Sequence, residues 1–405
     1  MAKKYIPQIR FKGFEGEWEE KKIEDVYKRS IEKNDLTYRE KDIISVANLY
    51  YKPEVKVSSK EYLLSYNVFK LGDIAFEGNK STDFSHGRFV ENTIGDGIVS
   101  HVFDVYRPII PYDIQYWKYA INNENVMRSL LIRCTKSATM MSALVASDFL
   151  KQKINVPNLS EQSQIGTLFC SLDKQISCSE EKLDKLRVIK KTLLKKMFAS
   201  QGEKTPQIRF KGFEGEWEEN ALNNWIEPSK EKNIENKYSK NDVLSVSGDY
   251  GVVNQIEFQG RSFAGVSVSN YGVLHTNDIV YTKSPLKANP YGIIKTNIGQ
   301  TGIVSTLYAI YKSKENVEPI FVQKYFEFDN RLNLYLRPLV RKGAKNDMKV
   351  SSEDAIKGNV IFPKKEEQSK ISKFFQILDK QISCQERKTE NLKAIKKTLL
   401  KKMFV

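Results

Sequence analysis

The chain has 405 residues, with 65 Lys and Arg against 50 Asp and Glu, so its formal net charge is +15 and its pI is about 9.3. This length predicts two or more domains, and this charge suits either a polyanion or an acidic membrane surface as partner. The start Met-Ala-Lys-Lys-Tyr has no apolar signal region, and no run of about 18 apolar residues occurs, so we expect a cytoplasmic protein without membrane spans. The four cysteines lack Cys-x-x-Cys spacing, which argues against a metal site.

The first distinctive segment is a strap at residues 7–20, which recurs without a change at residues 206–219. The offset between the two copies is 199, since 206 minus 7 is 199. Phe11, Phe14 and Trp18 lie among glycines that favour turns, so we expect this aromatic segment to pack on another part of the molecule. A ligand site built from these rings is the alternative.

Short β-like runs dominate the region between each strap and the helix that follows it. The runs lie at residues 43–46, 73–76 and 97–106 in the first half, and at 243–246, 278–281 and 302–311 in the second. The halves diverge, yet Gly-Ile-Val-Ser at 97–100 recurs at 302–305. Residues 112–131 and 319–339 show a helical pattern, and a basic loop follows each, at 133–142 and 341–352. We therefore predict a mixed α/β (α+β) fold that occurs twice with different loops.

Each half ends in a long amphipathic helix. Residues 160–198 and 366–404 are related by a constant offset of 206 and carry apolar residues at helical spacing. At about 1.5 Å per residue each helix spans roughly 57 Å, too long for one compact core, so we expect the two helices to pair. In the alternative, each helix packs along its own domain. The residues expected to pair the helices are Leu168, Leu172, Leu186, Ile189, Leu193, Phe374, Leu378, Leu392, Ile395 and Leu399.

No catalytic constellation occurs in the sequence, which predicts a chain without enzymatic activity of its own. Gly-Asn-Lys-Ser at 78–81 lacks the glycine before lysine that a P-loop needs to surround a phosphate. Asn289-Pro290-Tyr291 lacks the second proline of the motif that holds a flipped adenine in amino-methyltransferases, and no glycine-rich turn for a methyl donor follows a strand. The three histidines have neither metal nor triad spacing. We expect no catalytic, metal or cofactor-binding residues in this chain.

A basic molecule with two similar heads and unlike loops is suited to reading two different short DNA targets at a fixed separation. Lysines would contact phosphates, while Arg, Asn and Gln in loops would discriminate base edges. A stand-alone methyltransferase or nuclease, which the missing motifs disfavour, and a coiled-coil scaffold that binds only proteins are the alternatives. DNA contacts are expected where loop divergence and such side chains coincide, at Lys80, Arg88, Lys136, Ser137, Lys283, Lys287, Asn289, Lys345 and Asn346.

The straps and helices together resemble a known family, the specificity subunits of type I restriction-modification systems, and the resemblance covers the whole chain. Its marks are Arg-Phe-x-Gly-Phe-x-Gly-x-Trp at Arg10 and Arg209, and long helices that end Leu-Leu-Lys-Lys-Met-Phe. Before each helix stand a proline, Glu-Gln and an isoleucine, at Pro157, Glu161-Gln162 and Ile165, and again at Pro363, Glu367-Gln368 and Ile371.

The resemblance implies two target recognition domains, each reading half of a bipartite DNA site, held apart by an antiparallel coiled coil with an internal two-fold repeat. It implies as partners two methylation subunits and two motor-nuclease subunits, which would carry the sites for S-adenosylmethionine, ATP and Mg. The expected segments are domain 1 with its strap at 1–158, helix 1 at 159–200, domain 2 with its strap at 201–364, and helix 2 at 365–405.

Overall fold

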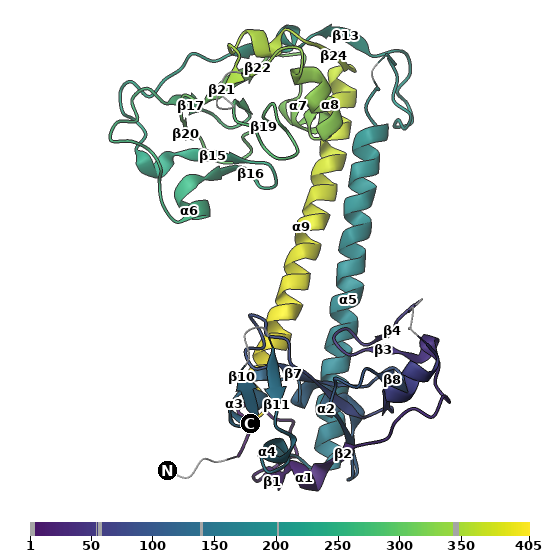
Figure 1. Ribbon diagram of the computed structural model, residues 1–405. Coiled ribbons are helices and arrows are strands. Elements are labelled where there is room, and N and C mark those ends of the chain that lie inside the picture. The colour runs from purple at the N-terminus through teal and green to yellow at the C-terminus, as the bar shows by residue number, and fades with distance from the viewer. Residues whose placement is uncertain (1–4, 54, 56–58, 138–140, 201, 343–347) are drawn as a thin grey trace. The chain divides into compact units, whose positions relative to one another are not determined.

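The computed structural model describes residues 5–53, 55, 59–137, 141–200, 202–342 and 348–405. It divides into two units, one made of Met1–Glu180 with Arg387–Val405 and the other of Glu181–Glu386. The long helices α5 (Leu159–Lys196) and α9 (Lys365–Lys402) each contribute to both units (Figure 1). Each unit therefore contains one head, the start of the helix that follows that head, and the end of the other helix.

The head of the first unit is built on a four-stranded antiparallel sheet in the order β2-β9-β6-β7. Its strands are β2 (Tyr27–Ser30), β9 (Val105–Pro108), β6 (Ile74–Glu77) and β7 (Arg88–Glu91). Two-stranded pairs surround it: β1 (Glu19–Lys22) with β12 (Lys153–Val156), β3 (Ile44–Ser45) with β4 (Tyr50–Tyr51), β5 (Asn67–Phe69) with β8 (Gly97–Val99), and β10 (Thr135–Ser137) with β11 (Ser142–Leu144). The helices are α1 (Ile23–Val26), α2 (Ile114–Ala120), α3 (Glu124–Cys134) and α4 (Ala146–Leu150).

The head of the second unit repeats this topology with the order β14-β21-β18-β19. Its strands are β14 (Ile226–Pro228), β21 (Tyr308–Ser313), β18 (Ile279–Thr282) and β19 (Ile294–Thr296). The flanking pairs are β13 (Glu218–Ala221) with β24 (Asn359–Phe362), β15 (Leu244–Ser247) with β16 (Gly251–Asn254), β17 (Gly272–Leu274) with β20 (Gly302–Val304), and β22 (Arg341–Lys342) with β23 (Met348–Lys349). The helices are α6 (Gln255–Gln259), α7 (Pro319–Phe326) and α8 (Asp329–Leu336). The prediction that one mixed α/β fold occurs twice is confirmed.

The helical stretch expected at 112–131 consists of two helices, α2 and α3. Asn123 separates them, because its side chain accepts a hydrogen bond from Asn125 N and so caps the start of α3. The stretch expected at 319–339 is likewise divided, into α7 and α8. In the first head a polar residue that bonds to the backbone thus ended a pattern that apolar periodicity alone would continue, whereas Phe328, which precedes α8, makes no such bond.

The long helices pack antiparallel within each unit. In the first unit, Lys396 Nζ lies 2.5 Å from Asp173 Oδ1, and the hydroxyls of Ser179 and Thr389 are 2.8 Å apart. In the second unit, Arg187 pairs with Glu386 at 2.7 Å and Lys190 with Asp379 at 2.6 Å. As the residue number of the contacting residue increases along α5, the number of its partner on α9 decreases, so the two helices run in opposite directions.

Two of the residues expected to pair the helices do not lie between them. Ile189 and Ile395, which the repeat relates, are 48% and 49% exposed. Lys190 and Lys396, the next residues, turn inward to Asp379 and Asp173, and successive side chains diverge by about 100° around a helix. Of the other expected residues, Leu172 and Leu378 are buried, and those that are partly buried against the cores are Leu168, Leu186, Leu193, Phe374, Leu392 and Leu399.

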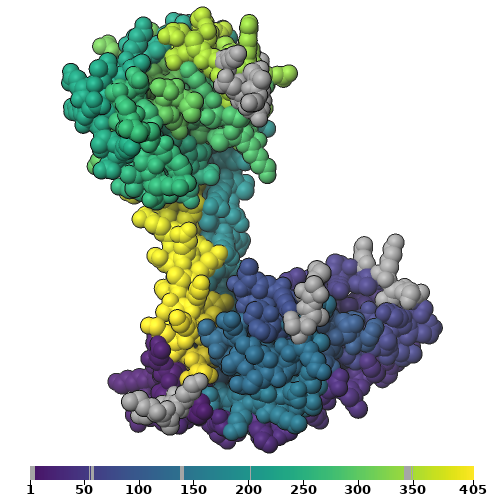
Figure 2. Space-filling view, turned by 60° about the vertical axis from the view of Figure 1, so that its left-hand side comes forward, coloured from purple at the N-terminus to yellow at the C-terminus, as the bar shows by residue number. Residues whose placement is uncertain are grey.

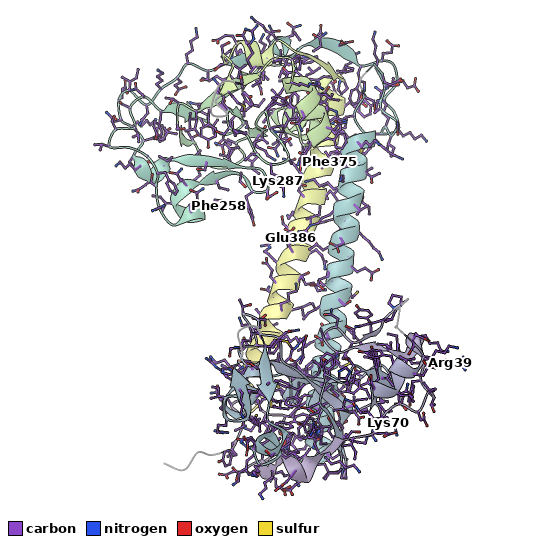
Figure 3. All side chains as sticks on the ribbon, in the orientation of Figure 1. Arg39, Lys70, Phe258, Lys287, Phe375 and Glu386 are labelled. Carbon is purple, nitrogen blue, oxygen red and sulfur yellow. The ribbon has the colours of Figure 1, made fainter. Side chains whose placement is uncertain are left out.

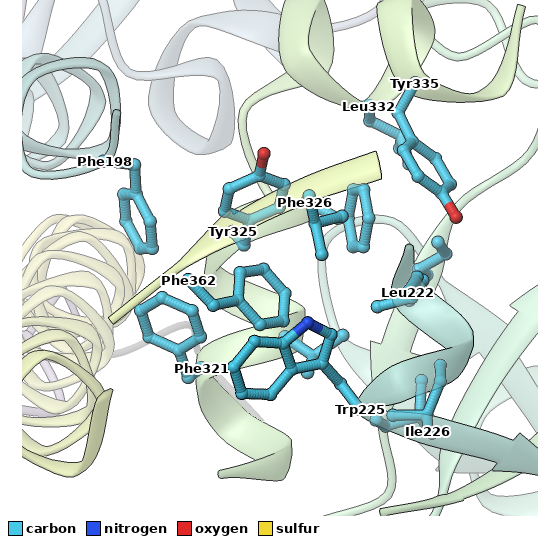
Figure 4. Close-up of a cluster of buried hydrophobic side chains, with 14 of the residues drawn as sticks. Phe198, Leu222, Trp225, Ile226, Phe321, Tyr325, Phe326, Leu332, Tyr335 and Phe362 are labelled. Carbon is cyan, nitrogen blue, oxygen red and sulfur yellow. The ribbon is translucent and has the colours of Figure 1, made fainter. Parts of the chain in front are cut away.

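The aromatic core of each head receives the end of a helix from the other half of the sequence. In the second unit, Phe198 of the first half stacks on Phe375 at 5.9 Å and packs on Phe321 at 5.4 Å (Figure 4). In the first unit, Phe404 of the second half stacks on Tyr116 at 5.6 Å. These contacts bury the ends of both helices against the heads. The burial explains why the apolar residues at helical spacing continue to the end of each helix.

The straps fasten the helices to the heads. Ile9 N donates to Lys402 O at 3.0 Å, and the purple N-terminal residues lie against the yellow end of α9 in Figure 2. Ile208 N makes the equivalent bond to Lys196 O at 2.9 Å in the second unit. Trp18 and Trp217 are 3% and 2% exposed in the two cores. The straps are therefore packing elements, and their tryptophans are not available to a ligand. No helix among the described residues is long and apolar enough to cross a bilayer.

Candidate nucleic-acid interface

Two loops of the first head meet and carry candidate phosphate contacts. Ser142 N at the start of β11 donates to Gly78 O in the β6–β7 loop at 2.7 Å. A Cβ on Gly78 would lie 2.2 Å from Ser142 O, so only glycine allows this approach. Lys80 is exposed on the β6–β7 loop, and Lys136 is exposed on β10, the strand that pairs with β11. The structure thus joins two segments whose contacting residues, Gly78 and Ser142, are 64 positions apart in the chain, since 142 minus 78 is 64. Ser137, also expected there, is the last residue of β10.

Arg88 has a different role from the one expected. Its Nε lies 2.7 Å from Glu77 Oε2, and its Nη2 donates to Ala47 O at 2.6 Å. The guanidinium also lies 5.1 Å from the centre of the Phe84 ring. Arg88 therefore links Glu77 of β6 to the turn between β3 and β4. The pairing of β6 with β7 places Glu77 directly opposite Arg88, so the strand register brings the two charges together.

In the second head, Asn289 anchors a loop and does not present its amide to solvent. It is 8% exposed, and its Nδ2 donates to Asp329 Oδ1 at 2.9 Å. Asn333 of α8 donates to Ala288 O at 3.0 Å, so the β18–β19 loop is held at two points. Lys287 is exposed at the outer part of this loop (Figure 3). Burial lowers the pKa of Lys283, which is half-buried at the base of the loop. Lys345 and Asn346 lie outside the described residues.

A partly buried ion network, which sequence reasoning missed, joins the second head to both long helices. Lys324 of α7 contacts Glu327 at 2.5 Å and Asp379 of α9 at 2.6 Å, and Lys190 of α5 contacts both carboxylates. Burial alone would raise the pKa of Glu327, but the ammonium groups of Lys324 and Lys190 lower it to about 2. The repeat offset of 206 relates Asp379 to Asp173, and it could have indicated that this aspartate contacts the helix partner in both halves.

The first head makes the equivalent junction with less charge. Tyr119 Oη donates to Asp173 Oδ2 at 2.6 Å, and Lys396 completes the contact. Tyr119 occupies the place that Lys324 has in the second head, in the helix that follows the sheet. Both junctions fix a loop-bearing head rigidly to the helix pair, which is what a site that reads a fixed geometry requires.

The chemistry of these loops suits binding of a polyanion. Lys80, Lys136 and Lys287 offer exposed ammonium groups on loops that a rigid scaffold supports. Within the described ranges, no group of three or more His, Cys, Asp or Glu side chains could hold a metal ion.

Comparison with known proteins agrees with this chemistry. Residues 15–188 match the family model described as the type I restriction modification DNA specificity domain. A putative type I restriction enzyme MjaX specificity subunit of Methanocaldococcus jannaschii is 22% identical over 308 residues, covering 72% of this chain and 67% of that protein. The resemblance noted from the straps and helices is confirmed.

Solved structures match the fold along the chain. The S subunit of a type I restriction-modification system from M. genitalium has 16% identity and a TM-score of 0.55, and the match covers 99% of both chains. The HsdS subunit from Thermoanaerobacter tengcongensis has 15% identity and a TM-score of 0.49, with 96% of both chains covered. At such identities the first of these matches establishes the fold.

Proposed function

The chain carries a type I restriction-modification DNA specificity domain and resembles specificity subunits along its length, and from this premise we propose that each head reads one half of a bipartite DNA site. In this proposal the paired helices set the number of unread base pairs between the half-sites. They also dock two methylation subunits, with which two motor-nuclease subunits assemble. The chain itself is not catalytic, and S-adenosylmethionine, ATP and Mg act on the partners. Its recognition domains are the segments 1–158 and 201–364.

The observation that carries the proposal is a scaffold used twice with different loops. Both heads have the same strand order, and the same contact fastens each to its own helix. Arg10 binds Glu161 through two hydrogen bonds of 2.7 and 2.8 Å, and Arg209 binds Glu367 at 2.8 and 2.7 Å. The loops that carry Lys80 and Lys287 differ in sequence and in anchoring. A repeated scaffold with variable loops is what two independent readers of DNA would need.

Exposed apolar residues on the helices support the docking of partners. Val188, Ile189 and Ile377 of the second unit are 65%, 48% and 60% exposed, and Ile395 of the first unit is 49% exposed. Exposed apolar side chains that lie together, as the neighbours Val188 and Ile189 do on α5, support a surface that another protein covers. We assign these positions to the contact with the methylation subunits.

Exchange of one head tests whether the heads act independently. Residues 21–156 would be replaced by the corresponding segment of another specificity subunit, leaving the strap, Glu161 and both helices unchanged. We expect one half-site to change and the other to be kept, read by mapping methylated adenines with the methylation subunits present. A change in both half-sites would contradict independent reading. Complete absence of salt-dependent binding to duplex DNA would favour a scaffold that binds only proteins.

An insertion in both helices tests their role as a spacer. Four residues added after Ser179 and four after Gln385 lengthen both partners by one turn, roughly 6 Å at about 1.5 Å per residue. At about 3.4 Å per base pair, the unread spacer should grow by one or two base pairs. The insertion also makes a stutter in the coil, so affinity is expected to fall somewhat. Methylated sites that keep their original spacer would show that the helices do not set it.

A further inference from the structure

The turn between β3 and β4 in the first head, residues 46–49, is held by an ion pair from the neighbouring sheet. We propose that Asn48 on this turn reads a base edge in the half-site of the first head, and that Arg88 is the positioning residue that holds the turn for it. This inference rests on the proposed function, since it names the reader within a head that is proposed to bind DNA.

The backbone of the turn is strained. Leu49 has a φ of 48°, in the left-handed region that an L-residue with a branched side chain rarely adopts, and its N donates to Ser45 O at 2.9 Å. Such a conformation persists only where surrounding contacts maintain it, and it recurs at functional sites. Glycine or asparagine would adopt this φ with less strain than leucine, so the residue at this position is not the one that would make the turn most stable.

The contacts that maintain the turn come from the neighbouring sheet. Arg88 Nη2 donates to Ala47 O at 2.6 Å, and Glu77 fixes the same guanidinium at 2.7 Å. The Glu77 side chain is 9% exposed, so this ion pair is shielded on one side and geometrically well defined. We call this arrangement of Glu77, Arg88 and Ala47 the turn clamp. The turn clamp fixes the carbonyl of Ala47, which precedes Asn48, and the backbone bond from Leu49 N to Ser45 O holds the residue that follows it.

The second head lacks the turn clamp. Thr282 stands at the place of Glu77 and Ile293 at the place of Arg88, where Thr282 N donates to Ile293 O at 2.9 Å. The equivalent hairpin of the second head, β15 with β16, has four regular residue pairs between Leu244 and Asn254. The residue with a positive φ, of 72°, is Gly251. The strained, clamped turn is thus a property of one head, as expected for a device that reads one half-site.

Asn48 has the chemistry that base reading requires. It is exposed, and its amide makes no hydrogen bond to any other described residue. An asparagine amide on a rigid turn can accept a hydrogen bond from adenine N6 through its Oδ1 and donate one to adenine N7 through its Nδ2, and this pair of bonds distinguishes that base. Tyr50 and Tyr51 beside it are 47% and 39% exposed, and Lys52 follows them at the surface. Aromatic rings and an ammonium group around a free amide suit the bases and phosphates of duplex DNA.

The first test replaces Asn48 by Ala in the full chain, assayed with the methylation subunits against a pool of random duplexes. We expect one base position of one half-site to become degenerate, with roughly ten-fold or greater loss of discrimination there and none in the other half-site. Asn122→Ala, another exposed amide in the same head, is the matched control and should leave the motif unchanged. An unchanged motif in Asn48→Ala would overturn the proposal.

The second test loosens the turn clamp without touching Asn48. Arg88→Met should relax discrimination at the same base position as Asn48→Ala, and the double variant should be no worse than Asn48→Ala. Arg88→Lys, which can still reach one oxygen, should restore part of the discrimination. Arg88→Met with a lower Tm but full discrimination would make the clamp merely structural and refute its positioning role. If the unmodified complex selects no motif from the pool, the proposed function fails first, and that result is distinguishable from a motif that Asn48→Ala leaves intact.

Discussion

The two heads share a backbone topology but differ in how they use polar groups at equivalent places. Where the first head joins the helix pair through Tyr119, Asp173 and Lys396, the second uses Lys190, Lys324, Glu327 and Asp379. Where the first has the buried Glu91 on its edge strand, the second has Thr296. Apolar packing and the strap ion pairs are repeated, whereas the polar groups at the helix junctions and on the edge strands are not. The comparison shows that the fold tolerates different polar solutions as long as each charge finds a partner or stays neutral.

Both heads also cap the helix end that they receive, again with different side chains. Asn123 Nδ2 donates to Leu400 O at 2.8 Å in the first unit, and Arg331 Nη2 donates to Leu194 O at 3.1 Å in the second. These carbonyls are related by the offset of 206 and lie in the last turn, where no backbone donor of the helix remains. Burial lowers the pKa of Arg331 to about 10, and the Phe198 and Tyr325 rings surround it at 4.9 Å. The requirement is shared, and the residue that meets it is free to vary.

The largest expected effect breaks the contact that the heads have in common. Arg209→Ala would leave the carboxylate of Glu367, whose side chain is 2% exposed, buried without its partner. We expect the free energy of unfolding of the second unit to fall by roughly 3 kcal/mol, and Arg10→Ala to do the same to the first unit. Urea unfolding followed by tryptophan fluorescence measures both, since each unit has two tryptophans.

Exposed Lys12 and Lys211 of the same straps supply the controls, because their replacement by Ala should change the free energy of unfolding by no more than about 0.5 kcal/mol. A loss confined to one of the two arginine variants would show that the straps, although identical in sequence, do not anchor the heads equally.

A second prediction sharpens the difference at the helix junctions. The pKa of Glu327 is lowered from an ordinary value of 4.5 to about 2, so its contribution to stability is present above pH 4.5 and is lost as the pH falls through about 2. Glu327→Gln should lower the free energy of unfolding of the second unit by roughly 2 kcal/mol at neutral pH and flatten its dependence on pH in this acid range. The free energy of unfolding is measured as a function of pH by the fluorescence of Trp217 and Trp225, in a background in which the two tryptophans of the first unit are replaced. If Glu327→Gln leaves the slope of this free energy against pH unaltered in the acid range, the network is contradicted.

The third prediction gives the first head the opposite pH dependence. Glu91 is 2% exposed, and burial raises its pKa well above the ordinary value of 4.5. Below pH 4.5 the Glu91 carboxyl group is neutral in both the folded and the unfolded state. As the pH rises from there through the folded pKa, the unfolded state loses its proton first, so the free energy of unfolding decreases. Glu91→Gln should therefore unfold like the parent near pH 4 and be more stable above neutral pH. The Tm of the variant and of the parent, measured near pH 4 and above neutral pH, tests this. A variant with a lower Tm at both pH values would show that the Glu91 carboxyl group makes a stabilising hydrogen bond that glutamine cannot make.

The smallest expected effect concerns the exposed isoleucines of the helices. Ile189→Ser and Ile395→Ser should each change the free energy of unfolding by no more than about 0.5 kcal/mol, whereas Leu183→Ala, at a buried place on the same helix, should cost roughly 2–5 kcal/mol. If these isoleucines contact the methylation subunits, the affinity for those subunits should fall in both serine variants. A loss of stability as large as that of Leu183→Ala would place them between the helices after all.

Much of the architecture followed from repetition in the sequence. Two constant offsets, one for the straps and one for the helices, predicted two heads, two long helices and the same fold in each half, because a repeated pattern of apolar residues must bury equivalent faces. The resemblance to type I specificity subunits rested on the same repeats. None of this required knowledge of which loops approach each other.

Only the tertiary structure decided the fate of individual polar side chains. Asn289 and Arg88 were both expected to contact DNA. In the structure Asn289 anchors its loop to Asp329, and Arg88 binds Glu77 and holds the β3–β4 turn. Ile189 was expected to pair the helices, yet its side chain is exposed because the next residue, Lys190, points inward to Asp379. A side chain's role depends on partners that are distant in sequence, since hydrogen bonds act over about 3 Å and a polar group is satisfied or left free by whatever the fold brings within that range.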